Sequence, residues 1–135
     1  MYLLCLKFTR LKLKFYKYQG AGNDFVMIDD REQIFPISTP LINKLCDRNF
    51  GIGADGLILL QNDNQSDFKM VYFNSDGNES TMCGNGGRCI IRFANDLDVA
   101  SDKMTFNAID GLHHGIVDEE VIRLQMIDVN EVEDH

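Results

Sequence analysis

Residues 84–97 have the period of an amphipathic helix, in a chain whose other segments mostly have the length and pattern of strands. The apolar residues that share one face of this helix are Ile90, Phe93, Ala94 and Leu97. A shorter helix is expected to begin at Ser38-Thr39-Pro40, because serine caps helices and proline is tolerated in their first turn, and to end near Asn49. Any fold of this chain must therefore cover one face of a single longer helix with strands.

Strand-length segments lie before, between and after these helices. They are residues 11–18, 25–29, 57–60 and 68–73, with further strands expected between residues 103 and 129. Turn chemistry separates them, at residues 19–24, at Asp110-Gly111 and at residues 118–120, and the last two are expected to close hairpins. This order predicts an α+β fold in which a sheet packs on the longer helix.

Length and charge narrow the classes of function. At 135 residues the chain has the size of one domain. Thirteen lysines and arginines against 21 aspartates and glutamates give a net charge of −8, which argues against nucleic acid as a partner. No apolar run approaches the ~20 residues of a membrane span, and the first residues do not have the pattern of a signal peptide. The expected location is therefore the cytoplasm, where cysteines stay reduced.

Metal binding is not expected. The four cysteines lack the spacing of a zinc site. His113 and His114 are adjacent and would point to opposite faces of a strand, so they cannot easily bind one ion together. Cys46 and Cys89 are expected in the core, as most reduced cysteines are, and Cys5 is left unassigned.

One glycine-rich loop resembles a nucleotide site only superficially. Residues 51–56 have the spacing G-x-G-x-x-G. In a dinucleotide-binding protein such a loop follows a strand and opens a helix, so that the helix N-terminus meets the pyrophosphate. Here a predicted helix precedes the glycines and a predicted strand follows them. Because the order is reversed, nucleotide binding is not expected.

A second glycine-rich segment carries more chemistry. Cys83 directly precedes the longer helix, whose first turn contains Gly84, Gly86 and Gly87 and is almost bare of side chains. The free N–H groups of such a turn can bind an anion such as a carboxylate. Their partial positive charge also favours the thiolate of a cysteine beside them. Cys83 is therefore a candidate base next to a candidate carboxylate site, with a purely structural role as the alternative.

Four motifs give the chain a specific resemblance. In order, they are YQGAGNDF at 18–25, DRNFGIGADG at 47–56, FNSDGN at 73–78 and MCGNGGR at 82–88. Together they resemble the successive motifs of diaminopimelate epimerase. A weaker similarity extends from about residue 11 to the end, so residues 1–10 are expected to be an N-terminal extension and residues 11–135 an N-terminal epimerase domain.

The resemblance implies a cofactor-free epimerase that interconverts LL- and meso-diaminopimelate in bacterial lysine and peptidoglycan biosynthesis. It implies Cys83 as one of two catalytic thiols, Asn23 and Asn74 as substrate-binding side chains, and Gly84 and Asn85 as donors of backbone N–H groups to the α-carboxylate. One thiolate would take the α-proton and another thiol would return a proton from the opposite face.

The resemblance also implies a fold and one local departure from the family pattern. Each of the family's two domains is a mixed sheet around a central helix, with the substrate between the domains. We therefore expect a mixed, mostly antiparallel sheet wrapped around the helix at 84–97, with one short extra helix. Gly56 stands where some members carry a glutamine, so a side-chain contact there would be absent.

The second catalytic thiol is not expected within this chain. Cys89 follows Cys83 on the same short segment and cannot readily face it across a bound amino acid, while Cys46 and Cys5 lack a glycine-rich helix start. We therefore expect the chain to be the first half of an epimerase, truncated before the second domain and inactive alone, with homodimerisation left open. Two alternatives stay open: a related racemase acting on proline or hydroxyproline, and a non-catalytic module that binds an amino acid or carboxylate in the half-pocket.

Overall fold

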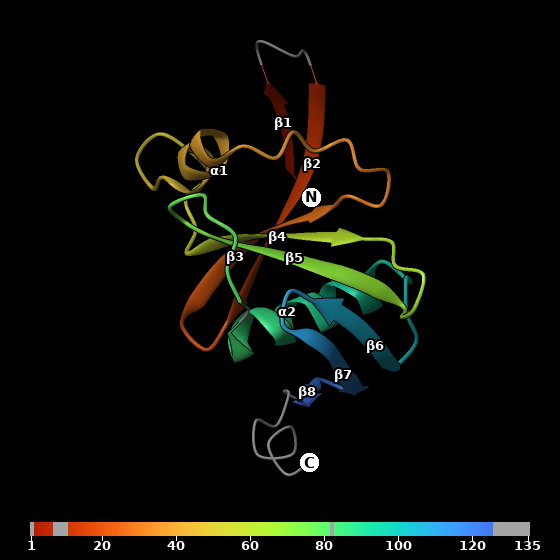
Figure 1. Cartoon of the computed structure of the whole chain (residues 1–135). Helices are drawn as coiled ribbons and strands as arrows, with labels where there is room; N and C mark the ends of the chain where they lie inside the picture. Colours follow the sequence, from red (N-terminus) through yellow and green to blue (C-terminus); the bar gives the residue numbers. More distant parts are fainter. Residues whose placement is uncertain (1, 7–10, 82, 126–135) are drawn as a thin grey trace.

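The computed structural model describes residues 2–6, 11–81 and 83–125 (Figure 1). Within these residues the strands form one mixed sheet whose spatial order follows the chain order. The strands are β1 (Tyr2–Leu6), β2 (Leu11–Gly20), β3 (Asn23–Asp29), β4 (Gly56–Gln61), β5 (Phe68–Asn74), β6 (Lys103–Ala108), β7 (Gly111–Asp118) and β8 (Val121–Gln125). Strand β2 pairs with two neighbours along its length. Residues 11–15 pair with β1, and residues 16–20 pair with β3.

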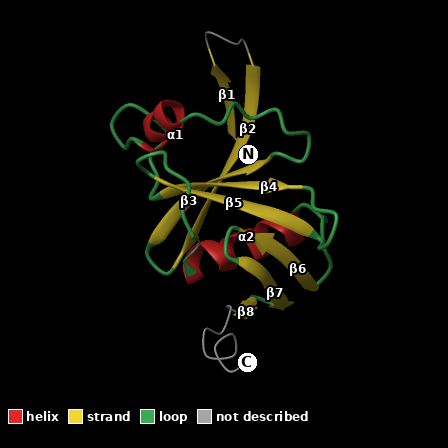
Figure 2. Ribbon diagram, in the orientation of Figure 1, coloured by secondary structure: helices red, strands yellow, loops and turns green. Residues whose placement is uncertain are grey.

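The sheet is mixed because it contains parallel strand pairs, and a helix lies in the connection of each such pair (Figure 2). α1 (Thr39–Cys46) lies in the connection between β3 and β4, and α2 (Gly84–Asp96) lies in the connection between β5 and β6. These are the two parallel strand pairs, which need a crossover connection, whereas all other neighbours are antiparallel. The predicted α+β fold, a mixed, mostly antiparallel sheet with one short and one longer helix, is confirmed.

The middle of the sheet is buried on both faces. Strand β4 has no exposed residue, and its side chains alternate between two apolar clusters. Leu57 and Leu59 join the cluster that contains Ile42 of α1, whereas Ile58 and Leu60 join the cluster that contains α2. This two-sided burial explains why the segment is a continuous apolar run in the sequence.

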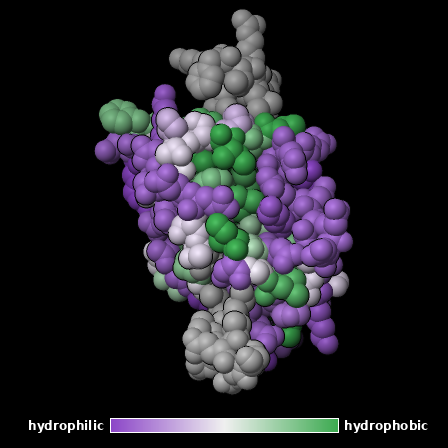
Figure 3. All heavy atoms as spheres, viewed as in Figure 1, coloured by the Kyte–Doolittle hydropathy of each residue, from purple (hydrophilic) through white to green (hydrophobic). Residues whose placement is uncertain are grey.

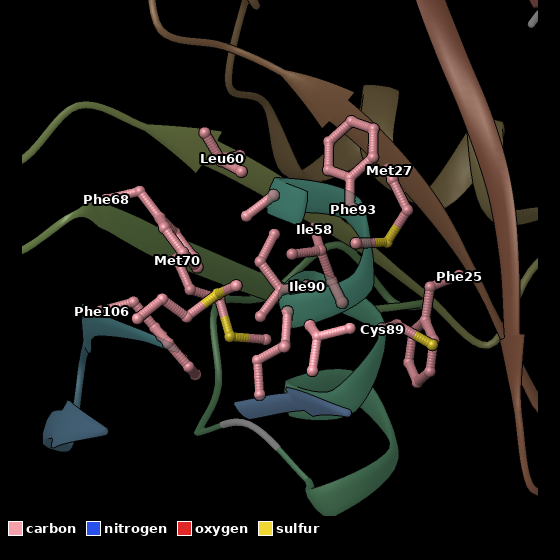
Figure 4. Close-up of a cluster of buried hydrophobic side chains, with 14 residues drawn as sticks. Phe25, Met27, Ile58, Leu60, Phe68, Met70, Cys89, Ile90, Phe93 and Phe106 are labelled. Atoms are coloured by element: carbon pink, nitrogen blue, oxygen red, sulfur yellow. The ribbon is translucent and has the colours of Figure 1, made fainter. Parts of the chain in front are cut away.

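Helix α2 packs against β2, β3, β4, β7 and β8. Its fully buried Ile90 and Phe93 point toward strand side chains that include Met27, Ile58 and Met70 (Figure 4). The predicted helix over 84–97 is therefore correct to within one residue, because Leu97 caps its C-terminus. Within the described ranges, neither helix is long and apolar enough to cross a membrane.

Several predicted boundaries differ from the structure. The turn expected over residues 19–24 contains only Ala21 and Gly22, because the residues on either side continue the β2–β3 ladder as far as Gly20 and Asn23. α1 ends at Cys46 rather than near residue 49. β1 was not predicted, and the part of the last expected strand region at 126–129 lies outside the described residues.

The two predicted hairpins are confirmed. Ala108 pairs with Gly111, and Asp118 pairs with Val121, so each hairpin has a two-residue loop. The strand alternation also separates the two histidines as predicted, since His113 is buried and His114 is exposed. The buried ring of His113 stacks on a phenylalanine of β6 and approaches Asp110, with its Nε2 2.8 Å from the carboxylate.

Candidate active site

Cys83 is the N-cap of α2 and its side chain is exposed. Its backbone is extended, which directs the side chain back over the start of the helix. The N–H of Gly86 donates to Cys83 Sγ at 3.3 Å, and the N–H of Gly87 donates to the Cys83 carbonyl at 3.0 Å. The predicted position of Cys83 directly at the start of the longer helix is thus confirmed.

The first turn of α2 leaves backbone donors available beside this sulfur. The N–H groups of Gly84 and Asn85 precede the first possible i to i−4 bond and so have no partner within the helix. No acidic side chain lies in this turn to compete for them. The turn lies against the sheet, since a Cβ added at Gly86 would make ordinary contacts with the Ile58 and Met70 side chains at 3.5 and 3.7 Å.

Asn23, at the start of β3, is held against this helix start. Asn85 Nδ2 donates to Asn23 Oδ1 at 2.6 Å, and Asn23 Nδ2 donates to Asp55 Oδ2 at 3.1 Å. Arg88 donates in turn to Asn85 Oδ1. Two of the predicted substrate-binding residues, distant in sequence, are therefore in direct contact, and Asn85 lies two positions after Cys83.

Asn23 contacts a cluster of charged side chains through its hydrogen bond to Asp55. Arg48 forms a two-pronged ion pair with Asp24, with N···O distances of 2.8 and 3.1 Å, and also contacts Asp55 at 2.9 Å. Lys17 donates to the same Asp24 carboxylate at 2.8 Å. The Arg48 guanidinium, aided by Lys17, holds the pKa of Asp24 well below its ordinary value. Sequence reasoning did not identify this cluster, although Asp24, Arg48 and Asp55 all lie inside the motifs.

Asn74 ends β5 and pairs with Gly56, the first residue of β4. Its carbonyl accepts from the N–H of Gly77 at 2.9 Å, and its own N–H donates to the carbonyl of Asn78 at 3.0 Å, so the chain turns tightly there. Gly77 has a φ of +91° and lies against the backbone of Thr39 in α1. Because the next strand over from Gly56 is β3, Asn74 and Asn23 lie toward the same end of the sheet.

The other cysteines whose side chains the structure describes are unlike Cys83. Cys46 and Cys89 are buried, as predicted, and burial raises the pKa of each thiol to about 11. Cys89 Sγ lies next to Gly20, where an added Cβ would be 3.3 Å away. Both thiols lie in the core, unlike the exposed thiol of Cys83. Cys5 lies in β1.

The glycine-rich loop at residues 51–56 lies between the elements that the sequence predicts. The glycines of residues 51–56 follow α1 and precede β4, so the order of a dinucleotide-binding loop is indeed reversed. A hollow of about 570 Å³ lies elsewhere, and none of the candidate residues lines it. Its wall includes Lys14, Asp29 and Arg31, of which the last two form an ion pair with an N···O distance of 2.7 Å.

Comparison with known proteins identifies relatives. A sequence model of the family described as diaminopimelate epimerase matches residues 15–126. A diaminopimelate epimerase of Flavobacterium psychrophilum is 66% identical over 125 residues, which are 91% of this chain and 49% of that protein. One from a Cyanothece species is 53% identical over 90 residues, 65% of this chain and 32% of that protein. The chain thus spans about half the length, or less, of these curated relatives.

Solved structures show the same fold at low identity. A hydroxyproline epimerase from Agrobacterium vitis, solved with bound trans-4-hydroxy-L-proline, superimposes with a TM-score of 0.61 at 10% identity, covering 91% of this chain and 44% of that one. At this level of identity the likeness concerns the fold alone.

Proposed function

The chain belongs to the diaminopimelate epimerase family, and from this premise we propose that it carries one side of the active site of a cofactor-independent amino-acid epimerase. The reaction is the interconversion of LL- and meso-diaminopimelate, a step of lysine and peptidoglycan biosynthesis. The observation that carries the proposal is the exposed thiol of Cys83 at the N-cap of α2, two residues before the Asn85 side chain that binds Asn23.

In this proposal Cys83 moves a proton at the α-carbon. Its thiolate takes the Cα proton and becomes a thiol, and the electron pair left on the carbon is delocalised into the adjacent carboxylate. A second thiol on the opposite face donates a proton to the carbon and becomes a thiolate, so the configuration inverts and the protons balance. The N–H of Gly86, which donates to Cys83 Sγ, would hold this sulfur in place at the start of α2.

The start of α2 would bind the substrate carboxylate. We assign this role to the N–H groups of Gly84 and Asn85, because they lack helical partners and no acid competes for them. Charge that develops on the carboxylate during proton removal is stabilised by such fixed donors. We assign polar contacts with the substrate to the side chains of Asn23 and Asn74, which lie toward the same end of the sheet.

The arrangement of the whole enzyme belongs to the same proposal. Residues 11–135 form its N-terminal domain with α2 as the central helix, and residues 1–10 form an extension ahead of it. We assign the second acid to a second domain, an assignment that the burial of Cys46 and Cys89 supports, and we infer that this chain alone is inactive. The intact enzyme works in the cytoplasm, and homodimerisation is compatible with it.

Selective alkylation tests this assignment. Iodoacetamide should label Cys83 at least about ten times faster than Cys46 and Cys89, because thiolate is the nucleophile and the two buried thiols have raised pKa values. Peptide mass spectrometry at several times measures the three rates in one sample. Equal or slower labelling of Cys83 would contradict its assignment as the base.

The alternative of a non-catalytic binding module makes a different prediction. Such a module would bind diaminopimelate without exchanging its α-proton, even when the second half of the enzyme is supplied. Equilibrium binding combined with deuterium incorporation from heavy water separates the two functions.

A further inference from the structure

The ring of Tyr72 lies over the backbone of Gly56. A Cβ atom on Gly56 would come within 3.0 Å of Tyr72 Cε1 and 3.3 Å of the Tyr72 hydroxyl. The phenol thus occupies part of the space that a side chain at position 56 would use, together with the carbonyl oxygen of Phe73, which would lie 2.8 Å from that Cβ. Phe25 contributes to holding it there through an edge-on ring contact, with centroids 6.1 Å apart.

This position is at the candidate active site. Tyr72 precedes Asn74 by two residues on β5, so the two side chains share one face of the sheet. Gly56 pairs with Asn74 and follows Asp55, whose carboxylate accepts from Asn23. The phenol therefore lies where the ends of β3, β4 and β5 bring the proposed substrate-binding side chains together.

The hydroxyl of Tyr72 is available as a hydrogen-bond donor. The residue is half-buried, and its hydroxyl forms no hydrogen bond with any atom of the described residues. Burial, and then the negative charges of Cys83 and Asp55, raise the pKa of Tyr72, so the phenol keeps its proton and can donate. Within the described residues, the Tyr72 hydroxyl is not among the polar atoms that are buried without a partner, so a ligand can reach it.

A carboxylate is the best acceptor for this donor. Hydrogen bonds to an ionised acceptor are shorter and stronger than those between neutral groups. The nearby carboxylate of Asp55 is already occupied, since it accepts from Arg48 at 2.9 Å and from Asn23 at 3.1 Å. An incoming carboxylate therefore meets a free donor on Tyr72.

We propose that Tyr72 is a substrate-contacting residue whose hydroxyl donates a hydrogen bond to a carboxylate of the amino-acid substrate. The inference rests on the proposed function and extends it, because it assigns to β5 the polar contact that Gly56 cannot make.

The test compares Tyr72→Phe, which removes the hydroxyl and keeps the ring, with Tyr16→Phe as a matched control. The ring of Tyr16 packs on Phe93, in the third turn of α2 and away from Cys83. Cys83 alkylation by iodoacetamide is followed in the full chain while the concentration of diaminopimelate is raised, and the concentration that halves the rate is recorded. Thermal unfolding of each variant without ligand reports any change in the fold.

We expect Tyr72→Phe to need about tenfold more diaminopimelate than the wild type for the same protection, as for loss of one hydrogen bond to a charged group. Tyr16→Phe should match the wild type, and the unfolding temperature of Tyr72→Phe should stay near that of the wild type. Equal protection of Tyr72→Phe and wild type would overturn this inference and leave the proposed function standing. Absence of protection in the wild type at any concentration would overturn both.

Discussion

At the scale of single residues, the candidate site depends on how one amide is held. Both ends of the Asn23 side chain are engaged, by Asp55 at the nitrogen and by Asn85 at the oxygen, which fixes the orientation of the amide. Asp55 is held in turn by Arg48, which also binds Asp24. The ion pairs therefore orient the side chain that we propose to contact the substrate.

The charge on Asp24 should make stability depend on pH. Because Arg48 lowers the pKa of Asp24 in the folded chain, this contribution is fully present above the ordinary aspartate value of about 4 and is lost as pH falls further. Asp24→Asn should therefore be less stable than the wild type at pH 7, and the difference should shrink below about pH 4. Urea unfolding of both proteins between pH 7 and 3 measures it, and a constant difference would show that the charge is not responsible.

Sequence reasoning named candidate site residues but not the contacts between them. Cys83 could be named as a candidate because the features that favour a reactive thiol are its immediate neighbours, a helix start with several glycines. The contacts of Asp24 with Arg48 and Asp55 could not be predicted in this way. These two residues lie 24 and 31 positions from Asp24 in the sequence, and only the fold brings them together. The same holds for Tyr72 over Gly56, which depends on the register of β4 with β5.

At the scale of elements, the spacing of apolar residues predicted the longer helix, because that helix packs one apolar face against the sheet. The end of the shorter helix is set by local hydrogen bonds, which leave no periodic pattern in the sequence. α2 was clear because one apolar stripe faces the sheet. α1 stops early because the Asp47 carboxylate accepts from the N–H groups of Asn49 and Phe50, and the N–H of Ile52 returns to the carbonyl of Leu45. Such capping bonds satisfy the end of a helix without any periodic pattern.

The turn that leads from β5 toward Cys83 should be sensitive to a single methyl group. Gly77 and Gly22 both have a φ above +90°, but a Cβ on Gly77 would lie 2.1 Å from the carbonyl oxygen of Thr39, whereas one on Gly22 meets nothing within 4 Å. Gly22→Ala should cost about 1–2 kcal/mol for backbone conformation alone. Gly77→Ala should cost at least about 3 kcal/mol, because overlap with α1 is added.

Chemical unfolding of these two variants and the wild type gives both values. Equal losses would mean that the contact between this turn and α1 does not constrain the segment before Cys83.

At the scale of the whole molecule, the candidate site residues lie toward one end of the sheet. Apolar and hydrophilic residues are also unevenly distributed over the surface. Figure 3 shows apolar residues in a band down the middle of one face, between two hydrophilic flanks. Apolar residues are also exposed on the last hairpin, among them Leu112, Ile116 and Val121. Cys83 is exposed, as the proposal requires for a thiol that contacts one face of the substrate.

The most direct test of the central claim joins this chain to the part of the Flavobacterium psychrophilum relative that it does not cover, which 66% identity makes a close match. The measured quantity is deuterium incorporation from heavy water at the α-carbon of diaminopimelate. The account predicts exchange in this chimera and a loss of at least about a hundredfold in its Cys83→Ala variant, the effect of removing an acid–base group. Exchange at an unchanged rate without the Cys83 sulfur would contradict it.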